Sequence, residues 1–170
     1  MDNFFEFFDF PVQFELDENA LRIAYLKNSK NFHPDYHVQD PDKHEEALRI
    51  TSINNKAYKT LLDEQSRIQH ILDLYNVSTE GVKLPPDFLM EMMEINEELM
   101  DAKMDDNQEL VSGIQKRAEI MKQEMHSKLL NALTQFDDSP QEDKANSLEL
   151  VKDLFLKMKY MKRLEENLNS

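Results

Sequence analysis

The sequence of 170 residues contains no cysteine, no tryptophan and only two glycines. Without cysteine the chain can form no disulfide, no thiolate nucleophile and no Cys-ligated zinc or iron–sulfur centre. Two glycines are too few for the Gly-rich loops that hold phosphates in dinucleotide-binding and P-loop enzymes. No apolar run reaches the roughly 18 residues that a membrane-spanning helix needs. We therefore expect a protein of a reducing compartment with no membrane partner.

Basic residues are also scarce, because 20 lysines and arginines stand against 34 acids and give a formal net charge of −14. Binding to nucleic-acid phosphates requires a concentrated basic surface, so we expect no nucleic-acid partner. The whole chain is 40% hydrophobic and 32% charged. That balance, with so little glycine, is typical of a helix-rich protein, and we predict an all-α fold.

Hydrophobic periodicity predicts four helices in the first half of the chain. Asp17 is a suitable N-cap for the second of them, on which Leu21, Tyr25 and Phe32 share one face. This helix must end near Phe32, because the residue before Pro34 is disfavoured in the α region. The four expected helices cover about 4–8, 18–32, 41–62 and 68–75.

A segment containing Gly81 and leading to Pro85 and Pro86 separates this half from the next. Three helices are expected after it: one over about 86–103, one beginning near 106–107, and one after Pro140. Helices of this length joined by short loops pack as an antiparallel bundle. We predict an N-terminal domain over 1–75, a linker over 76–84 and a C-terminal three-helix domain over 85–170.

Residue sets for catalysis or metal binding are not evident. Serine, histidine and acidic residues all occur, but no nucleophile elbow or zinc motif brings them together. His33 and His37 are four residues apart, yet Pro34 interrupts the helix that would place both on one face. Adjacent acids are typical of a solvated helix surface. We expect no enzyme activity, no metal and no cofactor.

One stretch, residues 19–34, contains no acidic residue in this acidic chain. Its bases lead into a loop held by proline: Arg22, Lys27 and Lys30, followed by His33, Pro34 and Asp35. A basic face beside a rigid polar loop suggests a docking surface for an acidic partner. An ordinary turn next to solvated lysines explains the same residues, and both interpretations stay open at this point.

A second stretch, between Lys83 and Lys103, contains six acids and no base. The expected inward stripe of this helix is Phe88, Met92, Ile95 and Leu99. Beside it lie further apolar and acidic positions: Leu89, Met93 and Met100, then Met90, Glu94, Glu97 and Asp101. An apolar patch rimmed by carboxylates suits a partner with an apolar centre and a basic rim. A wide core face with solvated acids is the alternative, and it is the commoner case among amphipathic helices.

Several motifs together resemble known families. The first 75 residues resemble the J-domain through these segments: Asn3-Phe-Phe-Glu-Phe-Phe-Asp-Phe10, Leu21-x3-Tyr25, His33-Pro34-Asp35 and Ile53-Asn54-x2-Ala57-Tyr58-x2-Leu61. Residues 88–99, Phe-Leu-Met-Glu-Met-Met-Glu-Ile-Asn-Glu-Glu-Leu, resemble the start of the HscB C-terminal domain. The whole chain is therefore similar to the HscB family of iron–sulfur cluster co-chaperones.

This resemblance implies a co-chaperone with two docking ends. One end would stimulate ATP hydrolysis by an HscA/DnaK-class heat-shock chaperone, and the other would bind the IscU-type iron–sulfur scaffold protein and deliver it to that chaperone. The implied chaperone contacts are His33, Pro34, Asp35, Arg22, Lys27 and Lys30. The implied scaffold contacts are Leu89, Met90, Met93, Glu94, Glu97 and Asp101, with an aromatic from the last helix, Tyr160 or its rival Phe155. J-domains usually carry lysine after the tripeptide, where this chain has Tyr36.

Two other functions remain open. The chain could serve a general DnaK-class chaperone and bind a different client through its C-terminal bundle, or its acidic, Met-rich bundle could mediate self-association. For location we expect a bacterial cytoplasm, because Met1 leads directly into the first expected helix without the import segment of mitochondrial family members.

Overall fold

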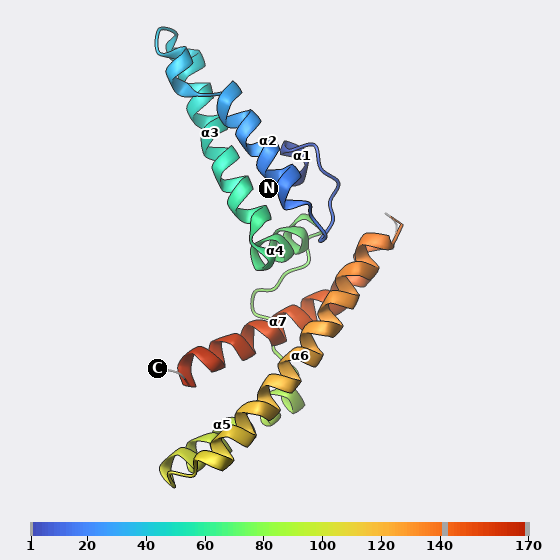
Figure 1. Cartoon of the computed structure of the whole chain (residues 1–170). Helices are drawn as coiled ribbons and strands as arrows, with labels where there is room; N and C mark the ends of the chain where they lie inside the picture. Colours follow the sequence, from blue (N-terminus) through green and yellow to red (C-terminus); the bar gives the residue numbers. More distant parts are fainter. Residues whose placement is uncertain (1, 141–142, 169–170) are drawn as a thin grey trace. The chain divides into compact units, whose positions relative to one another are not determined.

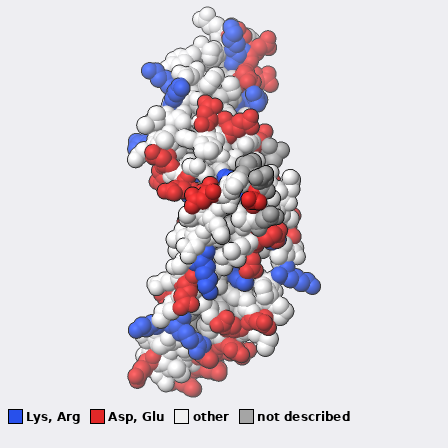
Figure 2. Space-filling model, turned by 90° about the vertical axis from the view of Figure 1, so that its right-hand side faces the viewer, with Lys and Arg blue, Asp and Glu red and all other residues white. Residues whose placement is uncertain are grey.

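The computed structural model describes residues 2–140 and 143–168, and every regular element within them is helical, as the all-α prediction requires (Figure 1). The chain divides into two compact units, residues 1–76 and 77–170. Within the described residues, none of the helices combines the length and the hydropathy that crossing a bilayer demands. Acidic and basic side chains are interspersed on the face drawn in Figure 2, so the acidity is not confined to one unit.

The N-terminal unit consists of four α-helices and one short 3₁₀ helix. They are α1 (Phe4–Phe7), α2 (Glu18–Asn31), η1 (Pro34–His37), α3 (Pro41–Leu62) and α4 (Glu64–Leu74). A short polar side chain caps the N-terminus of each of the four α-helices. At the start of α2, for example, Asp17 accepts hydrogen bonds from the backbone N–H groups of Asn19 and Ala20. These bonds satisfy donors that have no partner inside the helix, which fixes where each helix begins.

An antiparallel hairpin of α2 and α3 forms the body of this unit (Figure 1). The rings of Tyr25 and Tyr58 stack with centroids 4.3 Å apart across the two helices. Asn54, which is buried, donates through Nδ2 to the Tyr25 carbonyl at 3.1 Å and to Ser29 Oγ at 3.0 Å. The hairpin therefore holds its register by polar contacts as well as by its apolar core. That core comprises Phe4, Phe5, Phe8, Phe14, Leu21, Ala47, Ala57, Leu61, Ile68, Ile71 and Leu72.

Phe32, which the helical spacing placed on one face with Leu21 and Tyr25, is exposed, whereas Leu21 is buried. It is the C-cap residue, with φ −114° and ψ 32°, and therefore lies just outside α2. The helical period no longer applies at that position, so Leu21 at the other end of the face is buried while Phe32 is not.

The C-terminal unit contains three helices, α5 (Pro86–Met104), α6 (Gln108–Asp138) and α7 (Lys144–Leu168). Pro86 occupies the first turn of α5, where its missing N–H costs nothing, and Asn107 caps α6 by accepting from the N–H of Leu110 at 3.1 Å. A core cluster joins all three helices: Phe88, Met92, Ile95, Leu99, Ala102, Val111, Ile114 and Met161.

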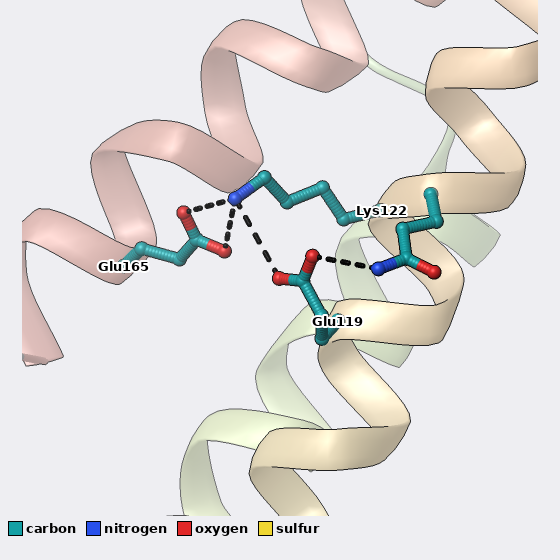
Figure 3. A network of polar contacts seen from close by, with 4 residues as sticks. Glu119, Lys122 and Glu165 are labelled. Carbon is teal, nitrogen blue, oxygen red and sulfur yellow. Dashed lines mark hydrogen bonds and ion pairs between the residues drawn. The ribbon is translucent and has the colours of Figure 1, made fainter.

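A polar network ties α7 to α6 (Figure 3). Lys122 Nζ donates to both carboxylate oxygens of Glu165 at 3.0 Å and lies 3.7 Å from a carboxylate oxygen of Glu119. The hydrogen bond to Glu165 raises the pKa of Lys122, and the nearby carboxylate charges add to that effect. The network thus links the second half of α7 to the middle of α6.

Candidate docking surfaces

The His-Pro-Asp loop, residues 33–35, connects α2 to η1. Nδ1 of His33 accepts a hydrogen bond from the Asp35 backbone N–H at 3.3 Å, so the His33 ring caps η1. The Asp35 carboxylate lies 3.7 Å from the same nitrogen, and both side chains are largely exposed. Because Nδ1 accepts, the neutral His33 ring carries its proton on Nε2 and can donate it to a partner.

Contacts from α3 hold this loop in place. His44 Nδ1 lies 3.1 Å from the Pro34 carbonyl oxygen, and Thr51 Oγ1 donates to the Phe32 carbonyl at 3.1 Å. The ring of Tyr36, which is exposed, lies 5.6 Å from that of His33 between centroids. Side chains of α3 therefore hold the backbone of the loop, while the side chains of residues 33, 35 and 36 stay accessible.

The basic residues expected at this site lie on the exposed side of α2, with apolar residues between them that the sequence did not single out. Arg22, Lys27 and Lys30 are all exposed. Ile23 and Leu26 lie on the same side, with exposed fractions of 68% and 52%. We call these five residues the α2 face. Residues 22, 26 and 30 of this face follow the i, i+4, i+8 spacing of neighbours on one side of a helix, which the sequence shows. The sequence does not show that this side of α2 is exposed.

In the C-terminal unit, one side of α5 faces away from the core. We define the α5 face as the apolar and acidic residues on that side: Leu89, Met90, Met93, Glu94, Glu97, Met100, Asp101 and Met104. All are exposed except Leu89, which is half-buried against the core cluster. The core cannot cover this face because Phe88, Met92, Ile95 and Leu99 already point into it from the opposite side of the helix. Met104 was missed from the sequence, although it follows Met100 at the i+4 spacing.

The acidic rim of α5 remains exposed along the helix. Glu98 pairs with Arg117 of α6 at 2.8 Å. The other five acids of the base-free stretch make no salt bridge with any part of the chain that the structure describes: Asp87, Glu91, Glu94, Glu97 and Asp101. Their uncompensated charge makes this rim attractive to a basic partner.

The last helix brings Tyr160 next to the beginning of α5. The Tyr160 ring meets the Phe88 ring edge to face, with centroids 5.8 Å apart, and it is half-buried. Phe155, its rival for the aromatic position, is buried. Of the two aromatics, only Tyr160 therefore keeps part of its ring accessible, next to Phe88 at the start of α5.

The residues of the chain's acidic surface do not assemble into a metal centre. Within residues 2–140 and 143–168, no three His, Cys, Asp or Glu side chains come together in a group able to hold a metal ion.

Comparison with protein families matches residues 84–169 to the HSCB C-terminal oligomerisation domain. Among curated proteins, a co-chaperone protein HscB homolog of Ralstonia nicotianae is 36% identical over 106 residues, which cover 60% of each chain. A homolog of the same description from Vibrio cholerae is 36% identical over 101 residues, 57% of this chain and 59% of the relative. The match thus spans about 60% of the length of these relatives.

Solved structures resemble the chain over nearly its whole length. The crystal structure of human co-chaperone protein HscB covers 99% of this chain and 81% of its own, with a TM-score of 0.71 and 24% identity. Chaperone HscB from Vibrio cholerae covers 98% of this chain and 96% of its own, with a TM-score of 0.70 and 26% identity. The helical fold of this chain is therefore similar to the fold of the solved HscB structures.

Proposed function

The chain belongs to the HscB family of co-chaperones, and from this premise we propose that it couples two partners through its two units. The N-terminal unit acts as a J-domain that stimulates ATP hydrolysis by an HscA/DnaK-class heat-shock chaperone. The C-terminal unit binds an IscU-type iron–sulfur scaffold protein and delivers it to that chaperone for cluster assembly or transfer. The family is one of co-chaperones and not of enzymes. We place the chain in a bacterial cytoplasm, and the bacterial source of curated members supports the bacterial part of this proposal.

The observation that carries this proposal is the α5 face. It presents exposed methionines on the side of α5 opposite the core, beside carboxylates such as Glu94 and Asp101. Exposed apolar side chains surrounded by charge of one sign mark a surface that a partner covers. A scaffold with an apolar patch and a basic rim fits it, with Tyr160 at one end of the footprint.

The α2 face and the His-Pro-Asp loop support the chaperone end of the proposal. Cations at positions 22, 27 and 30 attract an acidic partner over a distance, whereas Ile23 and Leu26 add apolar area once contact is made. His33 offers its Nε2–H from a loop whose backbone is fixed by α3. Such a loop binds with little loss of conformational entropy.

Steady-state ATPase measurements test the chaperone end. Rates are compared for a purified HscA/DnaK-class chaperone alone, with this protein, and with this protein plus an IscU-type scaffold. We expect stimulation that His33→Gln abolishes and that His126→Gln, an exposed histidine of α6, leaves unchanged. Equal stimulation by the wild-type protein and His33→Gln would exclude the proposed mechanism.

Scaffold affinity tests the other end separately. A combined Leu89→Ala, Met93→Ala and Tyr160→Ala variant should bind an IscU-type scaffold much more weakly. The matched control removes exposed apolar side chains elsewhere in the unit, Leu130→Ala with Leu150→Ala. If the control loses as much affinity as the triple variant, or the triple variant loses none, the α5 face is not the binding surface. Retention of another client instead of the scaffold would favour the general-chaperone alternative.

Self-association is a second candidate function for the C-terminal unit, because the matching family model is described as an oligomerisation domain. The α5 face itself is poorly suited to pair with its own copy, since the acids of two such faces would repel each other. Light scattering over a wide concentration range distinguishes the two functions. A monomer at every concentration would exclude self-association.

A further inference from the structure

The chain contains ten methionines and no cysteine, so thioethers are its only sulfur groups. The structure describes nine of the ten, all but Met1. Four of these nine are exposed, with exposed fractions between 54% and 82%, and all four lie on α5: Met90, Met93, Met100 and Met104. By contrast, Met92 on the same helix is 2% exposed and Met161 on α7 is 5% exposed.

Helical geometry places the four exposed methionines, which we call the methionine stripe, in a single row. At 3.6 residues per turn they fall within an arc of about 80° on the helix surface. The row extends about 21 Å along α5, from Met90 to Met104, at a rise of 1.5 Å per residue. Met92 lies on the opposite side of the same helix, in the core cluster. The accessible sulfur of the described chain is thus concentrated on the α5 face.

We propose that the methionine stripe is a site of reversible oxidation by hydroperoxides. The thioether sulfur attacks one peroxide oxygen, the O–O bond breaks and an S–O bond forms. With hydrogen peroxide the products are one methionine sulfoxide and one water, so sulfur loses two electrons and peroxide gains them. No thiol of this chain competes for the oxidant, because the chain has none. Reversal consumes two thiols of an external reductant, releases water and forms a disulfide, as in methionine sulfoxide reductases.

The effect of this oxidation rests on the proposed scaffold-binding function. A sulfoxide turns a flexible apolar side chain into a polar one whose oxygen must lose water when a partner covers it. Loss of one fully buried methionine contact weakens binding by about tenfold or more. Oxidation of Met90 and Met93 would therefore release the scaffold, and reduction would restore binding.

The fold should survive the modification. The stripe points away from the core, whereas Met92 and Met161 are enclosed within it. Oxidation confined to the stripe leaves the apolar contacts among α5, α6 and α7 unchanged. The modified chain should therefore remain helical, and its change in binding would arise from the surface alone.

Peptide mapping by mass spectrometry tests the site without reference to any partner. The full-length protein is treated with hydrogen peroxide for increasing times, quenched with catalase, and digested. We expect the four stripe methionines to oxidise at least roughly tenfold faster than Met92 and Met161, because susceptibility follows exposure. Methionine sulfoxide reductases A and B with dithiothreitol should reverse the change. Equal rates for Met92 and the stripe, with the circular dichroism of the helices unchanged, would overturn the assignment.

A binding measurement tests the consequence. Protein oxidised and freed of peroxide should bind an IscU-type scaffold at least tenfold more weakly than the reduced protein, on the estimate of about tenfold per buried methionine. A variant with leucine at all four stripe positions should show the same affinity before and after peroxide treatment, whatever that affinity is. If its affinity also falls on treatment, the stripe is not the cause. If reduced wild-type protein binds no scaffold, the proposed scaffold function fails, while the peptide map still decides the oxidation site.

Discussion

Nε2 of His70 in α4 accepts a hydrogen bond from the backbone N–H of Phe4 in α1, at 3.2 Å. The two rings are also stacked, with centroids 4.5 Å apart, and the His70 side chain is 3% exposed. Burial lowers the pKa of His70, opposed by the nearby charge of Asp73 and assisted by that of Lys56. A neutral histidine therefore fastens the first helix to the fourth across 66 residues of sequence.

We expect the stability of the N-terminal unit to fall in mild acid because of this residue. The pKa of His70 is lower in the folded state than the unfolded value of 6.5. Its contribution is therefore fully present above that pH and declines below it, until the folded chain also takes up the proton. Protonated Nε2 would carry a hydrogen facing the Phe4 N–H, so α1 should loosen first.

Amide hydrogen exchange and urea unfolding at several pH values between 5 and 8 would measure this effect. His70→Gln removes the titration and should flatten the pH dependence, whereas His126→Gln on the surface of α6 should leave it unchanged. A wild-type profile that is itself flat, or that His70→Gln does not alter, would contradict the assignment.

Asn54→Ala should destabilise the N-terminal unit by about 1–3 kcal/mol, because it removes two buried hydrogen bonds that Asn54 donates to acceptors of α2. Those acceptors are the Tyr25 carbonyl and Ser29 Oγ, both on α2. Urea unfolding monitored by circular dichroism gives the change. Ser52→Ala, at an exposed position of α3, is the control and should change stability by less than about 0.5 kcal/mol.

Met92→Ala should lower the stability of the C-terminal unit far more than Met93→Ala, although the two residues are adjacent. Met92 is in the core cluster, so truncation should cost about 2–5 kcal/mol in the free energy of unfolding. Met93 is exposed, so its truncation should change stability by less than about 0.5 kcal/mol. Thermal or urea unfolding of both variants measures the contrast. Equal losses would mean that α5 turns a different side to the core.

Lys122→Met should weaken the attachment of α7 to α6 by about 0.2–1 kcal/mol, the usual range for a partly exposed ion pair. High salt should diminish the difference between this variant and wild type. The raised pKa of Lys122 adds a second signature. Its stabilising contribution is present below the unfolded value of 10.5 and is lost as the pH rises through the higher folded value.

Amide exchange in α7 around Glu165 would report the change, since this residue is the partner of Lys122 on that helix. Lys128→Met, at an exposed position of α6, is the control. Identical exchange in the two variants would show that the network contributes nothing to holding α7.

Local chemistry made the helices predictable. Asp17 and Asn107 cap helices where the sequence places them, and Pro34 keeps α2 from continuing. Such signals act within a few residues, so one sequence is enough to read them. The period of the apolar residues likewise identified Met92, Ile95 and Leu99 as the inward side of α5.

Exposure was harder to predict, because it depends on which residues from elsewhere in the chain cover a side chain. Phe32 falls beyond the end of α2 and is exposed, while Phe155 is buried and Tyr160 keeps part of its ring accessible. The sequence did not predict that Ile23 and Leu26 are exposed, because their exposure depends on which side of α2 packs against α3. Nothing in the sequence around His70 indicated its bond to Phe4.

The sequence by itself therefore determined the all-helical class, the charge pattern and those helix ends that a cap or a proline marks, since these follow from composition, capping and period. It missed the start of α4, which is Glu64 and not residue 68. The absence of cysteine also left methionine as the only oxidisable sulfur in the chain. Only the tertiary structure decided which of those methionines the core encloses and which it leaves on the outer side of α5. The reason is physical: burial is a property of contacts between distant segments, and a local pattern specifies a face without specifying what covers it.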